Sequence, residues 1–113
     1  MNDGLYYLRV EPAGGGKAAN GGVFVLRNGK ILGGDAFFYY VGSYSAGGGR
    51  WSGEFSTHQH TRSDLAVPVF GAKEAKVAFS GSFAAATAEI EATSAVEGGE
   101  RGFRVALCRI ADA

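Results

Sequence analysis

Glycine and small polar residues interrupt this sequence so often that no long helix fits between them. The interruptions fall at residues 14–16, 20–22, 28–29, 33–35, 47–49 and 98–99. Glycine makes up 19 of the 113 residues, but prolines number only two and aromatic residues reach 12%. A disordered or collagen-like chain would be poor in aromatic residues or rich in proline. The sequence therefore predicts a folded chain of short strands and many turns.

Between the interruptions, apolar and polar residues alternate with the period of two that is typical of strands. The expected strands are residues 5–11, 22–27, 30–32, 37–45, 50–61, 76–83, 86–94 and 103–111. Asn28 and Gly29 both tolerate positive φ, so the second and third strands are expected to form a hairpin with a type I′ turn. The one long connection, residues 63–72, can hold at most one short helical turn.

Eight short antiparallel strands leave two exposed edges unless the sheet closes on itself. A closed sheet of eight strands is just wide enough for side chains or for one small ligand. We therefore predict an all-β fold in which residues 1–113 form one small, eight-stranded, up-and-down antiparallel barrel. A two-sheet sandwich is the alternative.

Large aromatic residues occupy many of the positions that the alternation turns toward the core. They are Tyr6, Trp51, Phe55, Phe79, Phe83 and Phe103, of which all but Phe83 are candidate pocket-lining residues. These side chains either fill a short barrel or line a small pocket at its mouth, and the alternation is compatible with both.

Several positions that the same alternation turns outward are also apolar, which is unusual for a monomer of this size. The expected outer surface consists of Phe38, Tyr40, Tyr44, Cys108 and Ile110, and Phe24, Leu26 and Ala106 are also expected to point outward. If their strands are neighbours, these residues form a self-complementary patch, and a homodimer is expected. The alternative is that the assignment of faces is wrong by one residue, as a bulge would cause.

No group of residues predicts an enzyme or a metal site. His58 and His60 share one face of a strand, a spacing that can place two imidazoles on one metal, but exposed histidines on a polar face are the simpler interpretation. The serines lack the surroundings of a catalytic nucleophile, and Cys108 lacks a base. We therefore expect a protein without enzymatic activity and without a cofactor.

Charge and cysteine content narrow the partners and the compartment. The chain carries 11 basic and 11 acidic residues, so neither a nucleic acid nor a membrane is the expected partner. Cys108 is the only cysteine, which excludes an intrachain disulfide and fits a reducing compartment. The N-terminus lacks the pattern of a signal peptide, and no apolar run is long enough to span a membrane. A cytoplasmic protein is expected.

A series of short motifs in the first half of the chain is found together in a known family. Residues 3–6 read DGLY, 21–25 read GGVFV, 28–35 read NGKILGGD and 40–44 read YVGSY. This series resembles the GrlR-like family, named for a negative regulator of type III secretion genes. The resemblance is strongest over residues 3–45 and continues more weakly to about residue 111.

The resemblance implies a calycin-like (lipocalin-like) eight-stranded barrel, a homodimer, and regulation by binding another protein. In the protein that gives the family its name, an acidic run in an exposed loop captures its partner. The matching loop here, residues 46–50, reads AGGGR and carries no acid. We therefore expect a regulatory or adaptor protein of the GrlR-like type without the acidic loop. The alternative is a protein that binds a small hydrophobic ligand at the barrel mouth.

Overall fold

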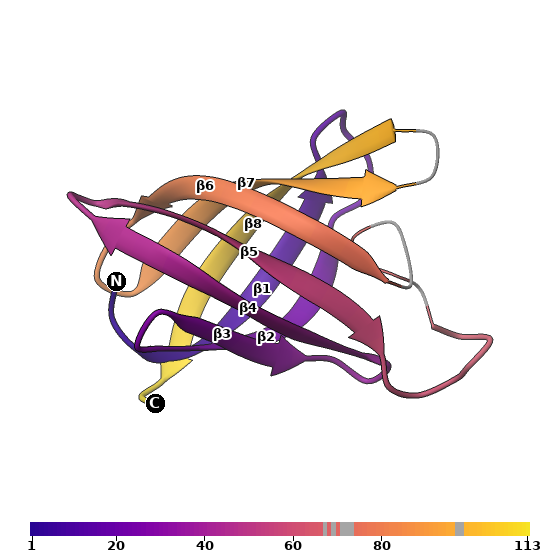
Figure 1. The fold of residues 1–113 in the computed structure, drawn as a ribbon, viewed down its shortest axis with the longest axis horizontal. Helices are drawn as coiled ribbons and strands as arrows, with labels where there is room; N and C mark the ends of the chain where they lie inside the picture. The colour runs from indigo at the N-terminus through magenta and orange to yellow at the C-terminus, as the bar shows by residue number, and fades with distance from the viewer. Residues whose placement is uncertain (67, 69, 71–73, 97–98) are drawn as a thin grey trace.

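The computed structural model describes residues 1–66, 68, 70, 74–96 and 99–113 and shows eight antiparallel strands in a closed barrel (Figure 1). The strands are β1 (Gly4–Pro12), β2 (Ala19–Arg27), β3 (Lys30–Gly34), β4 (Phe38–Gly47), β5 (Arg50–Gln59), β6 (Ala75–Phe83), β7 (Thr87–Val96) and β8 (Gly99–Ala111). Each strand pairs with its neighbours in sequence, and β8 closes the ring against β1. The predicted up-and-down barrel is confirmed, and the sandwich is excluded.

The turn between β2 and β3 has the geometry that its sequence predicts. Asn28 has a φ of 51° and Gly29 a φ of 78°. Leu26 then pairs with Ile31 and Val25 with Leu32. Positive φ at both central residues is the requirement of a type I′ turn, and this turn fixes the register of the hairpin.

Residues 20–22, which interrupt the sequence pattern, form a bulge inside β2. The pairing of β2 with β1 shifts between Tyr7↔Val23 and Arg9↔Asn20. Gly22 has a φ of 84°, and a Cβ at this position would lie 2.3 Å from the carbonyl oxygen of Gly34. The strand therefore begins at Ala19, earlier than predicted, because glycine lets the backbone bulge there without ending the pairing.

Two other glycines inside strands, Gly81 and Gly53, face the barrel interior and lie close to the backbone of a neighbouring strand. A Cβ on Gly81 would lie 1.8 Å from the carbonyl oxygen of Glu89, and one on Gly53 would lie 2.2 Å from that of Ser43. The pairing continues through both positions without a register shift. Both glycines therefore permit close backbone approach rather than bulges, and the bulges of the barrel involve β1.

The core of the molecule is the filled interior of the barrel. Five of the six aromatic residues predicted to point inward are at least 95% buried, and the sixth, Phe83, is half-buried and packs against the core. Their rings pack edge to face, with centroid separations of 4.7 Å between Trp51 and Phe79 and 5.1 Å between Phe24 and Phe55. Such contacts stabilise aromatic cores beyond the burial of area alone.

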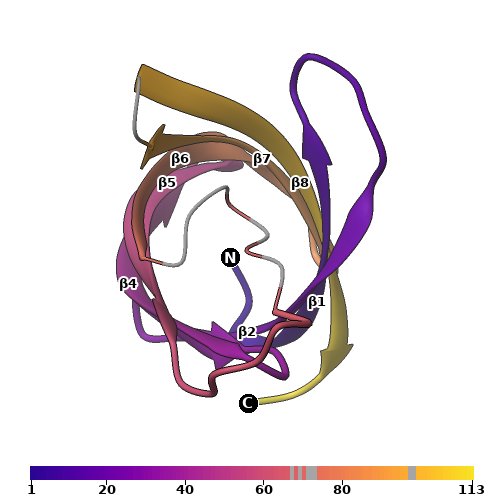
Figure 2. The ribbon, with the colours of Figure 1, turned by 90° about the vertical axis from the view of Figure 1, so that its right-hand side faces the viewer.

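The long connection between β5 and β6 contributes to this core. Phe70 is 1% exposed and packs among the interior rings. Figure 2 shows the barrel end-on, with the described part of this connection first looping past the edge of the strands and then turning across the opening of the barrel. The N–H of Ala66 donates a hydrogen bond to the carbonyl oxygen of Ser63 over 3.1 Å, which closes one turn. The rest of the predicted helical turn, at residues 67, 69, 71 and 72, lies outside the described residues.

Candidate interaction surfaces

The structure reverses the predicted faces of β4. Phe38 is 2% exposed and Tyr40 is 1% exposed, so both point into the barrel, and their assignment to an outer surface is wrong. Phe24 and Leu26 on β2 are both 0% exposed, so their outward assignment is wrong as well. Tyr44 is also placed differently, because its half-buried ring packs edge-on against Trp51 at 5.7 Å. The positions between them, Tyr39 and Val41, point outward instead. The alternation itself holds, but its phase is shifted by one residue.

Asp35 fixes this phase at the turn before β4. Its Oδ1 accepts hydrogen bonds from the backbone N–H groups of Phe37 and Phe38, over 2.9 and 2.8 Å. Its Oδ2 lies 2.9 Å from the hydroxyl of Tyr40, which also lies 2.8 Å from the carbonyl oxygen of Gly21. The inward position of Tyr40 thus connects β2, β4 and the turn between β3 and β4.

The environment of Tyr40 keeps its hydroxyl neutral. Burial raises the pKa of Tyr40 far above its ordinary value, and the hydrogen bond to Asp35 raises it further. A group that holds its proton across the physiological range does no acid–base work there. Tyr40 therefore has a structural role as an anchor between strands.

Exposed apolar side chains gather on the outer face of β1, β2, β3, β4 and the end of β8. We call this surface the apolar wall, and its exposed members are Tyr7, Leu32, Tyr39, Val41 and Ile110, with half-buried Leu5, Val23 and Val25 between them. Leu32 is 53% exposed and Ile110 is 56% exposed. None of these side chains belongs to the barrel core.

Strand pairing makes the apolar wall continuous. One row runs Leu5↔Val25, Val25↔Leu32 and Leu32↔Val41 across four strands. A second row joins Tyr7 to Val23 and continues through Gly34 to Tyr39. Side chains of directly paired residues on one face lie in contact, so these rows form one surface.

Cys108 and Ile110 extend the apolar wall onto β8. Cys108 is exposed and pairs with Tyr7, and Ile110 lies in the register shift where β8 meets Leu5 and Tyr6. The sequence predicts both residues on the outer face, and the structure places them there. Their part in a dimer stays a prediction.

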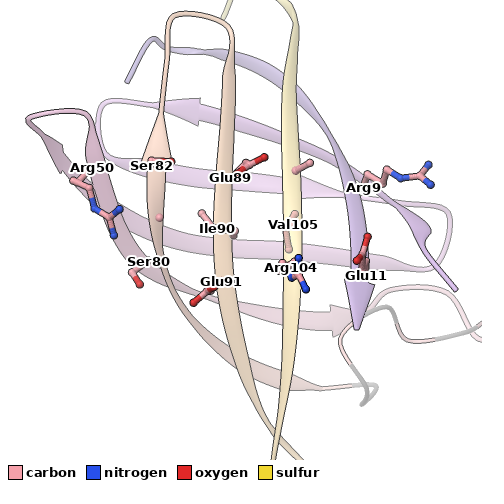
Figure 3. Close-up of a pocket in the computed structure, with 12 residues that line it drawn as sticks. Arg9, Glu11, Arg50, Ser80, Ser82, Glu89, Ile90, Glu91, Arg104 and Val105 are labelled. Carbon is pink, nitrogen blue, oxygen red and sulfur yellow. The ribbon is translucent and has the colours of Figure 1, made fainter. Parts of the chain in front are cut away.

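The outer face on the other side of the ring, over β6, β7, β8 and β1, carries charges of both signs. A groove of about 440 Å³ crosses it, which we call the charged groove. Its charged residues are Arg9, Glu11, Arg50, Glu89, Glu91 and Arg104 (Figure 3). Small outward residues such as Ser80, Ser82 and Ala106 leave the hollow between them.

The charges of this groove are not locked into salt bridges. Arg104 pairs in the ladder with Glu91 on one side and Glu11 on the other. Yet the salt bridges found among the described residues are His58–Glu74 and Arg109–Asp112, both elsewhere. Figure 3 shows Arg50 and Arg9 at opposite ends of the groove. The arrangement is that of a solvated face with balanced charge.

His58 and His60 have separate environments. The ring of His58 stacks on Tyr39 at 5.0 Å, and its Nδ1 lies 3.7 Å from Oε1 of Glu74. His60 follows the end of β5, and its Nε2 lies 3.0 Å from the carbonyl oxygen of Asp35. The described part of the chain contains no cluster of three metal-ligating side chains.

Three buried polar atoms inside the barrel have no hydrogen-bond partner among the described residues. They are Nε1 of Trp51, Oγ1 of Thr57 and Oγ of Ser94. Thr57 and Ser94 are also the buried polar residues of the described interior. Buried hydroxyls normally find partners, so these positions are candidates for contact with a bound molecule.

Comparison with known proteins assigns no family to this barrel. No family model and no curated protein matches the chain. The resemblance to the GrlR-like family thus remains a prediction from short motifs. Within the described residues, no helix has the length and apolar character needed to cross a membrane.

Proposed function

We propose that this chain is a non-enzymatic adaptor that acts by protein–protein binding through its apolar wall, and that its first partner is a second copy of itself. The observation that carries this proposal is the continuous row of Val25, Leu32 and Val41 on the outer face of a barrel whose interior is already filled. Soluble monomers seldom leave such a surface in water.

The exposed members of the apolar wall are large side chains. Tyr7, Leu32, Tyr39, Val41 and Ile110 are each 40–56% exposed. Apolar side chains that gather on one face, rather than being scattered singly, are typical of protein interaction sites.

The geometry of the barrel favours two identical partners. Every strand is hydrogen-bonded to a neighbour on both sides, so strand edges are not available for pairing with another molecule. Association must then use the outer face of the sheet. A sheet face packed against its own copy forms a two-fold interface in which the same residues meet on both sides. The formal net charge of zero adds no long-range repulsion between copies.

The resemblance to the GrlR-like family supports a regulatory role for the resulting dimer in the cytoplasm. Pairing through the apolar wall would leave the charged groove of each copy facing water. A regulatory partner could then be held without the acidic loop that this chain lacks.

The mass of the protein in solution tests this proposal. Light scattering coupled to size exclusion should give a dimer mass at 10–50 μM for the wild type, at a concentration range where ordinary homodimers persist. Leu32→Glu should give the monomer mass, because a carboxylate in the centre of the interface would be buried without a partner.

The matched control places the same charge on the other outer face. Ser80→Glu lies beside the charged groove and should keep the dimer mass. A monomeric wild type at 50 μM, or a dimer that Leu32→Glu leaves intact, would exclude the apolar wall as the interface.

A further inference from the structure

Phe70 fills part of the barrel interior that the strands do not fill themselves. It belongs to the connection between β5 and β6, and its side chain is 1% exposed. Its ring centroid lies 5.2 Å from that of Phe55, 5.5 Å from that of Phe103 and 6.1 Å from that of Tyr40, each in edge-to-face geometry. Rings on β4, β5 and β8 thus surround a space that accepts one aromatic ring.

Small inward residues on three adjacent strands explain why this space exists. They are Thr57 on β5, Ala75 on β6, and Ala92 and Ser94 on β7, all at least 92% buried. Thr57 pairs with Tyr40 and with Ala75, while Ala92 pairs with Phe103. The small residues are therefore neighbours of the rings that hold Phe70. An eight-stranded barrel has room for one small ligand where its inward side chains are small.

Two of these small residues carry hydroxyl groups that nothing in the described residues satisfies. Thr57 is 3% exposed and Ser94 is 0% exposed, and neither side-chain oxygen has a hydrogen-bond partner there. The phenyl ring of Phe70 cannot accept or donate a conventional hydrogen bond. A buried hydroxyl without a partner is unfavourable, so a molecule that bonded to it would gain affinity from that contact.

We infer that this end of the barrel is a binding site for a small uncharged aromatic molecule with one hydrogen-bonding group, and that Phe70 is its internal occupant. The aromatic part takes the place of the Phe70 ring among Tyr40, Phe55 and Phe103. The polar group bonds to the hydroxyl of Thr57 or Ser94. An anion is disfavoured because the described interior holds no buried cationic side chain. This site lies inside the barrel and is independent of the apolar wall.

Calorimetric titration of the full chain with three probes of similar size tests the inference. Benzyl alcohol should bind the wild type at millimolar concentration or below. Toluene, which lacks the hydroxyl, should bind about tenfold more weakly, and benzoate should not bind. Phe70→Ala should bind benzyl alcohol at least tenfold more tightly, because no ring must then be displaced.

Substitution of the two hydroxyls separates a built site from a simple cavity. Ser94→Ala and Thr57→Val should keep the affinity for toluene, and at least one of them should lose the preference for benzyl alcohol. Ser52→Ala, on the outer face of β5, is the matched control and should change neither affinity. If Phe70→Ala does not fold, Phe70→Leu tests the same displacement with a smaller loss of packing.

Two results would overturn the inference. One is a wild type that binds neither benzyl alcohol nor toluene, which would make Phe70 an ordinary core residue. The other is equal affinity for the two probes that neither hydroxyl substitution changes, because any apolar cavity can accept an aromatic ring. Both results leave the apolar wall and its dimer untouched.

Discussion

The apolar wall lies mainly over β1–β4 and the charged groove mainly over β6–β8, and the two surfaces meet on β1 and β8. They differ in the side chains that face water. Both are built from strands that alternate inward and outward residues. On the inner side the two regions are alike, with buried side chains that are mostly apolar. On the outer side, Leu32 and Val41 stand where Glu91 and Arg104 stand across the ring.

This contrast shows where the barrel is free to vary. A closed barrel encloses a fixed volume, and the inward side chains of all strands must together fill that volume. The outward positions carry no such requirement. A solvated face of mixed charge keeps a protein soluble, whereas an apolar face lowers solubility unless something covers it. The difference therefore points to the apolar wall as the surface that binds a partner.

The largest effect on stability is expected at inward-facing glycines, because the strands of both regions approach their neighbours closely there. Gly81→Val on β6 and Gly33→Val on β3 would each place a Cβ within about 2 Å of a carbonyl oxygen on the neighbouring strand. We expect each variant to lose more than about 3 kcal/mol of unfolding free energy, or not to fold at all. Urea denaturation measures the loss.

Gly47→Ala is the control for these two variants, since a Cβ there meets nothing within 4 Å. Its unfolding free energy should stay within about 0.5 kcal/mol of the wild type. If Gly81→Val were as stable as Gly47→Ala, close backbone approach would not be what shapes the barrel.

The next largest effect is expected when outward apolar residues of the apolar wall are replaced by charged residues. Leu32→Lys combined with Val41→Glu places a cross-strand charge pair at the centre of the apolar wall. We expect the proposed dimer to dissociate about 100-fold more readily, equivalent to about 2.7 kcal/mol, because a well-packed centre dominates interface energetics. Analytical ultracentrifugation over a concentration series gives the dissociation constant.

The reverse exchange, Glu91→Leu with Arg104→Leu, serves as the counterpart. It should leave the wild-type dimer constant unchanged while lowering solubility, because it adds a second exposed apolar surface. A dimer weakened equally by both exchanges would show that the two outer faces do not differ in function.

Because Tyr40 points inward, its neighbours Tyr39 and Val41 point outward. Removing the Tyr40 hydroxyl tests how much this inward anchor stabilises the fold. Tyr40→Phe removes the contacts to Asp35 and Gly21. We expect a loss of about 1–3 kcal/mol of unfolding free energy at pH 7, since the single hydroxyl donor shared between the oxygens of Asp35 and Gly21 is lost. Chemical denaturation at that pH measures it.

The dependence of the unfolding free energy on pH in the alkaline range tests the role of Tyr40 independently. Its pKa is raised in the folded protein by burial first and by the Asp35 hydrogen bond second. The folded state therefore keeps a proton that the unfolded state loses near pH 10. This contribution is complete below pH 10 and falls by about 1.4 kcal/mol per pH unit above it. Tyr40→Phe should flatten the decline, and a profile identical to that of the wild type would contradict this account.

The smallest effect is expected in the charged groove. Arg104→Gln removes one exposed charge between Glu91 and Glu11. Because no salt bridge is formed there, we expect a change in unfolding free energy within about 0.5 kcal/mol and an unchanged molecular mass. Thermal unfolding at two salt concentrations measures it. A loss above about 1 kcal/mol would show that the groove contributes to the fold as well as to solubility.

Residue patterns predicted much of this fold because several local signals agreed. Asn28 and Gly29 fixed one hairpin and its register. Alternation placed Trp51, Phe55 and Phe79 in the core. Where polar residues occupy every second position, as in β6 and β7, the inward face follows directly from the pattern.

The pattern failed on β2 and β4 because residues 23–26 and 37–41 are apolar on both faces. Alternation then has no polar side to set its phase, and a shift of one residue exchanges the faces. The register of the hairpin between β2 and β3 predicts part of the apolar wall. In a two-residue turn that pairs Leu26 with Ile31, Val25 and Leu32 must share the opposite face.

The sequence alone determined the number of strands and their antiparallel order, and it favoured closure of the sheet over a sandwich. Turn residues and period-two alternation act locally, and eight short strands have few ways to bury their apolar faces. The tertiary structure decided which face of β4 lies inside, how Phe70 enters the barrel, and that Leu32 and Val41 adjoin. These outcomes depend on filling one enclosed volume from all strands at once, which no single segment encodes.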